Sequence, residues 1–290
     1  MSTQAYPTSI RIFLADGTPD GIRLVGKSNW TGKAIVAGRA QLAAALGRDE
    51  MSQPGLYVLV GSGESGLSRI YIGEADVLKH RLRQHQRQKD FWTKFVAFTS
   101  TDENLNKAHV RYLESKLVAL AKEANQWEID NSTDPTEPSL SEADRADAEW
   151  FLREMLVIYP ILGVDAFESA ADEISEVEAG EVLSLKQRGA EGKGRETKDG
   201  FVVLSGSRAR ASETNSIHNY LRELRSQLLG KSVLVPDGDH LRFTQDFRFA
   251  SPSTAAGVLV GSAENGRLAW KTASGKTLKQ IQNENAEAVP

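Results

Sequence analysis

The sequence predicts an α+β protein with two domains, the second smaller than the first. Short runs rich in β-branched and aromatic residues alternate with segments in which apolar residues recur at helical spacing. Short turn-rich segments join several of the strand-like runs, which favours small antiparallel sheets flanked by helices. The 290 residues exceed one typical domain and suit two.

Residues 1–50 are predicted to form an N-terminal β extension. Residues 9–14 alternate in polarity, and turn signals follow at Asp16-Gly17 and Asp20-Gly21. Residues 21–25 can return as a second strand, and residues 40–46 have a helical composition. The main domain is therefore expected at residues 51–165.

The main domain is predicted to open with an antiparallel hairpin. Residues 55–60 and 70–72 are strand-like, and a glycine-rich segment joins them. The glycines of that segment match the spacing of a dinucleotide-binding loop, but such a loop needs a helix directly after it, and a strand follows instead. We therefore interpret the segment as a turn, so that Tyr57 and Tyr71 lie on paired strands.

A helix capped by Asp76 is predicted after the hairpin. Arg81 and His85 stand four residues apart on it and therefore share one face. Residues 94–99 are predicted as a third strand. The polar residues 101–103 are expected to open another helix, with Glu114 at the edge of its apolar stripe.

The rest of the chain is predicted to contain a helix, a linker and the second domain. Asn131 lies in a turn-rich segment, and a helix from about residue 141 ends the main domain. The stretch of residues 166–180 is rich in acids and is expected to be a solvated linker. Residues 181–282 form the predicted accessory domain, and residues 283–290 are a tail.

Within the accessory domain, residues 182–185 and 201–204 are predicted to bracket a glycine-rich charged loop. A helix from about residue 217 is closed by Gly230, and Ser251-Pro252 is typical of a helix start. Asn265-Gly266 is predicted to form a hairpin turn.

Composition limits the classes of function. The chain has no cysteine, which excludes disulfides and thiolate metal sites and favours a cytoplasmic location. The longest apolar run is too short to cross a bilayer, so we expect no membrane partner. The net charge of -4 disfavours bulk coating of nucleic acid. One segment is nevertheless strongly basic, and it is either a solvated helix face or a phosphate-binding surface: Lys79, Arg81, Arg83, Arg87 and Lys89.

An ordered series of motifs runs through the main domain. It consists of Gly55-Leu56-Tyr57, Tyr71-Ile72-Gly73, Arg81-Leu82-Arg83-Gln84-His85, Glu114 and Asn131. This series resembles the GIY-YIG nuclease family over roughly residues 55–164, with Leu56 in place of the isoleucine of the family name. Taken singly, each residue also has an ordinary structural interpretation, such as a core tyrosine or a Glu114 that pairs with Arg111 or Lys107.

The resemblance implies a metal-dependent DNA endonuclease that hydrolyses phosphodiester bonds. It implies that Tyr57 activates or positions the attacking water and that Tyr71 orients that water or the phosphate. Arg81 would bind the scissile phosphate, and His85 would make an accessory proton or phosphate contact. Because a free tyrosine has a pKa of about 10, Tyr57 needs a nearby cation or metal-bound hydroxide to act as a base at neutral pH.

The resemblance also implies one metal ion. A lone carboxylate such as Glu114 suits a hard cation that keeps most of its waters, so Mg²⁺ or Mn²⁺ is expected. Asn131 is expected to contact the metal or phosphate region, with Asn125 as an adjacent candidate. The five basic residues from Lys79 to Lys89 are expected to contact DNA.

Two details bear on the branch of the family. Glu74 follows the second motif where excision-repair relatives place lysine, whereas His85 resembles the restriction-endonuclease branch, so we expect restriction-like cleavage. Two alternatives remain open, a catalytically inactive DNA-binding protein and a regulatory protein with the same fold.

The accessory domain resembles an uncharacterised domain that accompanies restriction-associated and nuclease proteins. The resemblance rests on residues 200–204, on residues 251–256 and on Asn265-Gly266 before Trp270. The position of this domain after the acidic linker leads us to expect a targeting or partner-binding module, through which the chain would contact a second copy or another protein.

Overall fold

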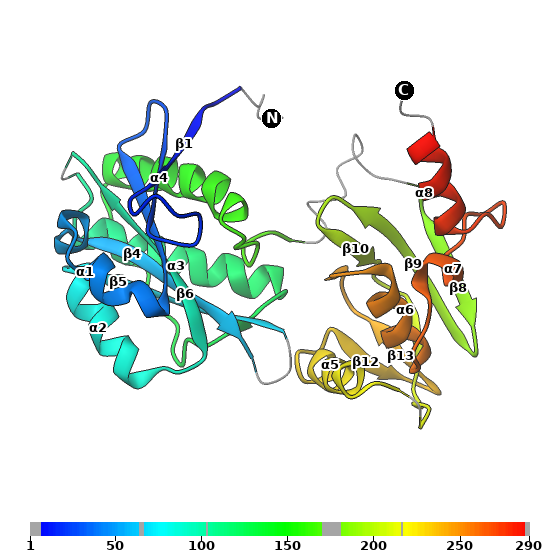
Figure 1. Cartoon of the computed structure of the whole chain (residues 1–290). Coiled ribbons are helices and arrows are strands. Elements are labelled where there is room, and N and C mark those ends of the chain that lie inside the picture. Colours follow the sequence, from blue (N-terminus) through cyan, green and yellow to red (C-terminus); the bar gives the residue numbers. More distant parts are fainter. Residues whose placement is uncertain (1–6, 64–66, 103, 170–180, 216, 288–290) are drawn as a thin grey trace. The chain divides into compact units, whose positions relative to one another are not determined.

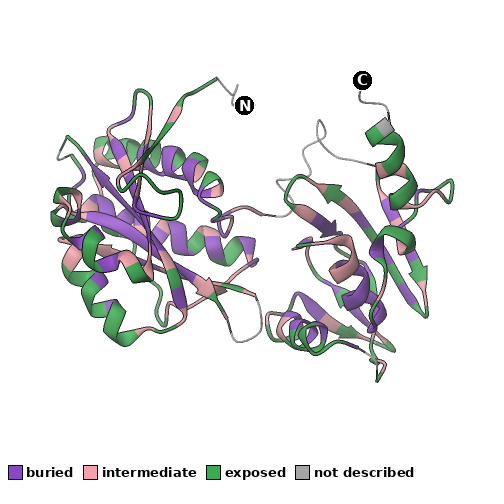
Figure 2. Ribbon diagram, in the orientation of Figure 1, coloured by how far each residue is buried: buried purple, intermediate pink, exposed green. Residues whose placement is uncertain are grey.

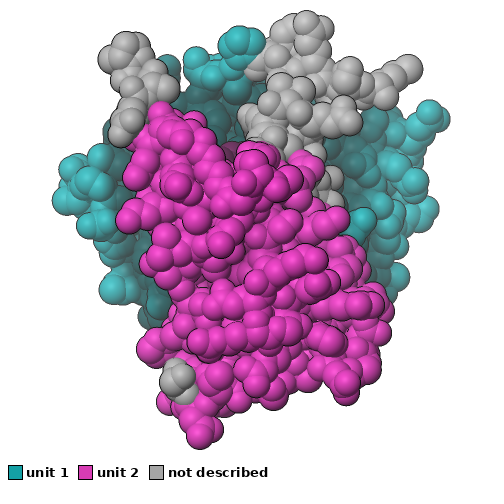
Figure 3. All heavy atoms as spheres, turned by 90° about the vertical axis from the view of Figure 1, so that its right-hand side faces the viewer, with its two compact units in different colours: residues 1–63, 68–167 teal, residues 64–67, 168–290 magenta. Residues whose placement is uncertain are grey.

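The protein has two compact units, each of α+β architecture (Figure 1). The computed structural model describes residues 7–63, 67–102, 104–169, 181–215 and 217–287. Unit 1 comprises residues 1–63 and 68–167, and unit 2 comprises residues 64–67 and 168–290 (Figure 3). The predicted linker, residues 166–180, lies mostly outside the described residues, but Ala166 and Phe167 are buried in the core of unit 1.

Unit 1 is built on one sheet, which has seven strands within its described residues. The strand order is β1-β2-β3-β6-β4-β5-β7, and all neighbours are antiparallel except β5 and β7, which are parallel. The strands are β1 (Ile10–Leu14), β2 (Arg23–Lys27), β3 (Gly32–Gly38), β4 (Gly55–Ser62), β5 (Ser68–Ala75), β6 (Trp92–Ser100) and β7 (Glu128–Ile129).

Strands β1, β2 and β3 of the predicted N-terminal β extension belong to this same sheet, so the boundary predicted at residue 50 does not divide two domains. Strand β3, absent from the prediction, pairs with β6 in a register that places Val36 opposite Val96. Its glycine and alanine residues have low strand propensity, yet residues 34–37 are buried. Packing in the middle of the sheet therefore overrides local propensity.

Helices cover both faces of the sheet in unit 1. Helices α1 (Leu42–Leu46) and α2 (Leu78–Gln88) lie on the face of Tyr57, whereas α3 (Lys107–Ala124) and α4 (Glu142–Ile161) lie on the other. Two short 3-10 helices, Arg39–Gln41 and Asp49–Ser52, flank α1. Strands β4 and β6 are buried almost throughout because they are covered on both faces (Figure 2).

Two helix starts differ from the prediction. Helix α2 begins at Leu78 without a side-chain cap. Asp76 instead forms an ion pair with Lys107, with 2.6 Å between Asp76 Oδ2 and Lys107 Nζ. Helix α3 begins at Lys107, later than expected, because the Asn106 side chain caps the backbone N–H groups of Ala108 and His109. Of the predicted start, residues 101–103, the last lies outside the described residues.

Unit 2 has a second antiparallel sheet with strand order β12-β13-β11-β9-β10-β14, in which β8 also pairs with β9. The strands are β8 (Leu183–Gln187), β9 (Ala190–Thr197), β10 (Gly200–Val203), β11 (Arg208–Arg210), β12 (Leu234–Asp237), β13 (His240–Phe243) and β14 (Phe247–Phe249). Four helices accompany it within the described residues: α5 (Asn219–Gly230), α6 (Pro252–Val260), α7 (Gly266–Ala269) and α8 (Leu278–Glu287).

The predicted glycine-rich charged loop is the central strand β9. A Cβ atom at Gly192 would lie 2.6 Å from Leu259 Cδ1, and one at Gly194 would lie 2.4 Å from Phe201 Cε1. The two glycines therefore make room for large core side chains on the inner face, while charged residues alternate on the outer face. Local sequence reasoning interpreted these glycines as turn residues because the packing partners are distant in sequence.

Two further predictions for unit 2 are wrong. Asn265-Gly266 starts the short helix α7 and forms no hairpin, because Gly266 lies against the backbone of Pro252, 2.1 Å from where its Cβ would be. The predicted tail is helical as far as Glu287 in α8. Thr277 and Gln280 cap the start of that helix reciprocally.

Membrane crossing would require a longer and more apolar helix than any found among the described residues.

Candidate active site

The two tyrosines share one face of the β4–β5 hairpin. Tyr57 lies opposite Gly73 and Leu59 lies opposite Tyr71, so the side chains of Tyr57, Leu59 and Tyr71 project from the same face of the hairpin. The ring centroids of Tyr57 and Tyr71 are 6.2 Å apart. Tyr57 is fully buried, whereas Tyr71 is partly exposed. The strand pairing predicted from sequence therefore brings the two phenols together.

Gly73 allows this arrangement because the Tyr57 ring lies across it. A Cβ atom at position 73 would lie 2.5 Å from the Tyr57 hydroxyl oxygen and 2.9 Å from Tyr71 Cε1. Close packing also explains the glycine of the first motif, since a Cβ at Gly55 would lie 2.3 Å from the Phe98 carbonyl oxygen. Both motif glycines thus permit close packing beside the tyrosines.

Replacing Gly73 with alanine is expected to destabilise the protein by about 1–3 kcal/mol, because the added methyl group displaces the Tyr57 ring from a closely packed site. Urea denaturation of the full chain measures this change. Gly26→Ala is the matched control, because Gly26 is in the same sheet and has nothing within 4 Å of its Cβ position. Equal stability losses in the two variants would contradict the packing account.

Helix α2 places His85 against both tyrosines. His85 Nε2 and the Tyr57 hydroxyl oxygen are 2.8 Å apart, and the His85 ring centroid lies 4.8 Å from that of Tyr71. His85 Nδ1 has no hydrogen-bond partner among the described residues. Burial, followed by the positive charges of Arg81 and Lys89, lowers the pKa of His85 to about 4. The imidazole is therefore neutral at pH 7.

Tyr57 keeps its proton at neutral pH. Burial, and then the neighbouring Tyr71, raises the pKa of the Tyr57 phenol well above its usual value, although Arg81 acts in the opposite direction. Tyr57 is thus a hydrogen-bonding group in the resting site, and its hydroxyl can exchange a proton with the neutral His85 ring.

Arg81 interacts electrostatically with both tyrosines and with Glu114. It is exposed on α2, and Arg81 Nη1 donates to Gln84 Oε1 at 2.8 Å. Burial opposes its charge, but the Tyr57 and Tyr71 phenols more than offset that effect and raise the pKa of Arg81. The same guanidinium partly offsets the burial that raises the pKa of Glu114. It is therefore placed to share an anionic ligand with the tyrosine pair.

Glu114 reaches this region from α3, on the other face of the sheet. Strand β7 pairs with β5 only at Arg69 and Ile70. The later part of β5, which carries Glu74, is therefore not paired with β7. Burial, followed by repulsion from Glu74, raises the pKa of Glu114 to about 7, while the Glu74 backbone, Arg81 and Arg111 lower it. Sequence reasoning noted Glu74 as a departure from the family and missed its position beside Glu114.

The carboxylates of Glu114 and Glu74 fit a hard divalent cation. Their mutual repulsion is relieved when a cation binds, and carboxylate oxygens are the ligands that Mg²⁺ and Mn²⁺ prefer. The described residues contain no group of three or more His, Cys, Asp or Glu side chains that could hold a metal. A cation here would keep several waters, as Mg²⁺ usually does.

Asn131 is engaged by the backbone of β5. Its Oδ1 accepts from the Ile72 N–H at 3.0 Å, and its Nδ2 donates to the Ile72 carbonyl at 2.7 Å. This two-point contact fixes the Asn131 side chain to the edge of β5, next to Tyr71 in the chain, and engages both polar atoms of its amide. The alternative, Asn125, ends α3 with a left-handed φ of 50°.

The predicted basic residues divide into two groups. Lys79 Nζ donates to Ser52 Oγ at 3.0 Å, and Lys89 pairs with Asp130, which also pairs with Arg69. Lys89 Nζ also lies 4.3 Å from the centroid of the Tyr71 ring. The structure thus adds Asp130 to the surroundings of the tyrosines. Arg83 and Arg87 are exposed on α2.

Comparison with protein-family models matches residues 183–282 to a domain of unknown function, DUF4357. The match falls within unit 2 and within the predicted accessory domain, and it covers about a third of the chain. Neither curated proteins nor solved structures yielded a match.

Proposed function

We propose that this protein is a metal-dependent DNA endonuclease that cleaves phosphodiester bonds in a restriction-like manner in the cytoplasm. The observation that carries the proposal is the position of Arg81, which interacts with both tyrosines and with Glu114. Phosphodiester hydrolysis requires a proton acceptor for water, a cation at the developing charge and a fixed phosphate. Residues suited to all three tasks surround one guanidinium.

Arg81 would bind the scissile phosphate. A planar guanidinium can donate two parallel hydrogen bonds to phosphate oxygens, and this one is exposed enough to reach a ligand. Tyr71, which is partly exposed beside it, would orient the phosphate or the attacking water through its hydroxyl group. The exposed Arg83 and Arg87 would contact flanking phosphates from the same helix.

Tyr57 and His85 would form a proton relay. Tyr57 is protonated, so it can accept a proton from water only as it passes its own proton to His85 Nε2, 2.8 Å away. Arg81 and Lys89 contribute to the low pKa of His85, and a bound phosphate would offset both positive charges. The histidine would therefore become a better proton acceptor once DNA occupies the site.

Glu114, with Glu74 beside it, would hold the metal ion. When bound, Mg²⁺ or Mn²⁺ supplies positive charge that polarises the phosphate and stabilises the leaving oxygen. Glu114 must lose its proton to bind a cation, and its raised pKa makes that step pH-dependent near neutrality.

The direct test is cleavage of supercoiled plasmid and of labelled single-stranded DNA by the full chain with Mg²⁺ or Mn²⁺. We expect conversion of the plasmid to the nicked form, and EDTA is expected to stop it. One such site cuts one strand, so linear product would require two protomers or two successive nicks. Metal-independent DNA binding without cleavage would instead support the inactive DNA-binding protein, and the absence of both would support the regulatory protein.

A further inference from the structure

One face of the unit 2 sheet carries a concentration of positive charge. The helices α5 and α6 pack on the inner face, where Leu185, Ala209 and Phe201 are buried. Partnered residues of antiparallel strands share a face, so the registers assign the outer residues. The registers also place Arg248 and Lys271 on this side of the sheet. Among its cations, six from four neighbouring strands form what we call the basic sheet face: Lys186, Lys193, Arg195, Arg208, Arg210 and Arg242.

The acids on the same face leave much of this charge uncompensated. Glu191 pairs with Lys186 at 3.2 Å, while Asp237 lies 3.6 Å from Arg208 Nε and 3.8 Å from Arg242 Nε. Exposed pairs at such separations contribute little stability, so a stronger anion can displace them. The positive charge is local, since the whole chain has a net charge of -4.

Three of the six cations, Lys193, Arg195 and Arg210, have no ion pair among the described residues. Lys193 and Arg195 alternate along β9, which places them about 6.6 Å apart in a row, and Arg210 lies on the neighbouring strand β11. Beneath the face, the buried Arg225 donates to the Arg210 carbonyl at 2.6 Å. The backbone that presents the charges is thus held from below.

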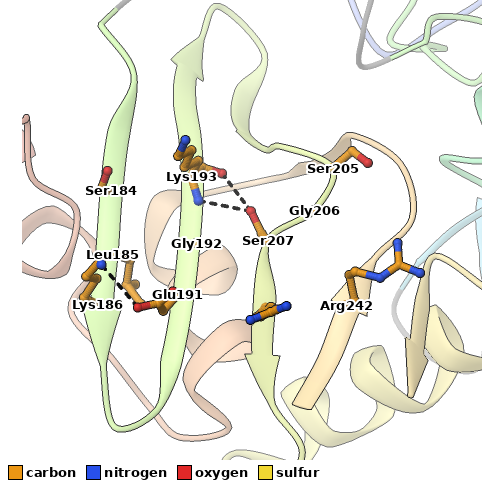
Figure 4. A pocket seen from close by; sticks show the side chains of 11 residues that line it. Ser184, Leu185, Lys186, Glu191, Gly192, Lys193, Ser205, Gly206, Ser207 and Arg242 are labelled. Carbon is orange, nitrogen blue, oxygen red and sulfur yellow. Dashed lines mark hydrogen bonds and ion pairs between the residues drawn. The ribbon is translucent and has the colours of Figure 1, made fainter. Parts of the chain in front are cut away.

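A hollow of about 490 Å³ lies in the middle of this face (Figure 4). Strands β9 and β11 pair at Glu191 and Arg208, and beyond that point Ser207 bridges to the Lys193 backbone through its hydroxyl group. Figure 4 shows Lys186, Lys193 and Arg242 on separate strands around the hollow. Basic side chains therefore surround a depression rather than a flat surface.

Among the described residues, this face carries no phenylalanine, tyrosine or tryptophan side chain. Of the six such residues in the described part of unit 2, Tyr220 is on α5, and the others are buried: Phe201, Phe243, Phe247, Phe249 and Trp270. His240, opposite Arg210, places one half-buried imidazole ring on the face. Single-stranded nucleic acids are usually held by stacking of bases on aromatic rings. A face with cations and hydroxyl groups but no exposed phenylalanine, tyrosine or tryptophan ring suits the phosphate backbone of duplex DNA.

We propose that the basic sheet face of unit 2 binds the phosphate backbone of duplex DNA without reading its sequence. The choice of DNA rests on the proposed function of unit 1, but the surface itself does not include residues of the candidate active site. Unit 2 would hold the substrate while unit 1 cleaves it, and its contribution to affinity would depend strongly on salt.

The test compares the full chain with the triple variant Lys193→Ala, Arg195→Ala, Arg210→Ala. Fluorescence anisotropy measures binding to a labelled 30-base-pair duplex between about 50 and 200 mM salt, in EDTA so that no cleavage occurs. Each lost phosphate contact lowers the slope of log K against log salt by about 0.9, so we expect the slope to decrease by about 2–3.

A matched control removes the same charge from the helices of unit 2 with Arg222→Ala, Arg267→Ala, Lys279→Ala. These side chains are exposed on α5, α7 and α8. The control is expected to retain the slope of the unmodified chain, and circular dichroism checks that both variants fold. An unchanged slope in the first variant, equal losses in both, or no duplex binding by the unmodified chain would overturn the proposal. Because the assay measures binding and needs no cleavage, it tests the basic sheet face even if the nuclease proposal fails.

Discussion

Glu114→Gln is expected to reduce the proposed metal-dependent DNA cleavage by about 10³-fold, because it removes the carboxylate proposed to hold the cation at the phosphate. Glutamine keeps the size and one carbonyl oxygen of the side chain but cannot carry a negative charge. Plasmid nicking across a range of Mn²⁺ concentrations measures the effect, and duplex binding in EDTA is expected to be unchanged. Full activity in this variant would exclude Glu114 as the metal ligand.

The same carboxylate predicts how activity depends on pH. The pKa of Glu114 is about 7, so below that value most Glu114 is protonated and the apparent affinity for metal falls about tenfold per pH unit. Cleavage at low metal concentration is therefore expected to rise between pH 6 and 8 and then level off. Saturating metal should shift the rise to lower pH, since a bound cation favours the ionised form.

Stability provides an independent check on Glu114. Its folded-state pKa of about 7 lies above the ordinary glutamate value of 4.5, so the folded protein binds more protons between these two pH values. The free energy of unfolding therefore falls as pH rises from about 4.5 to about 7, because a buried Glu114 must ionise, and Glu114→Gln removes this decrease. After allowance for partial exposure to solvent, the variant is expected to gain about 1 kcal/mol at pH 8, or roughly 2–4 °C in Tm, and little at pH 4.

Arg81→Ala is expected to slow the proposed cleavage by about 10³-fold, because this guanidinium, beside the tyrosines, is the group proposed to bind the scissile phosphate. Arg81→Lys is expected to restore a small part of the rate, since an ammonium retains the charge but loses the planar pair of donors. Single-turnover cleavage with saturating protein separates this effect from DNA affinity.

Arg83→Ala provides the control for Arg81 on the same helix. Arg83 is also exposed on α2, and its loss is expected to weaken DNA binding without a large change in the single-turnover rate. If Arg81→Ala affected affinity alone, as Arg83→Ala should, Arg81 would be a backbone contact and the proposed site would be wrong. Arg81→Ala would also raise the pKa of His85, because the positive charge of Arg81, after burial, contributes to the low pKa of that histidine.

Local pattern predicted the parts of the site that depend on spacing along the chain. Alternation and turn signals predicted the hairpin that pairs the strands of Tyr57 and Tyr71, since a period of two determines which residues share a strand face. The four-residue interval between Arg81 and His85 likewise predicts a shared side of one helix. The α+β class followed from the same two periodicities.

Burial and long-range pairing decided the rest. Only packing of α3 on the sheet buries Glu114 and brings it near Glu74. Burial, followed by repulsion from Glu74, raises the pKa of Glu114 to about 7. The Asn131 clamp on Ile72 and the use of Gly192 in a strand are equally invisible to local spacing, because each depends on partners far away in sequence. Spacing along the chain therefore places residue types on one strand or one helix face, whereas their environments come from the tertiary structure, since desolvation and charge coupling arise when distant segments pack.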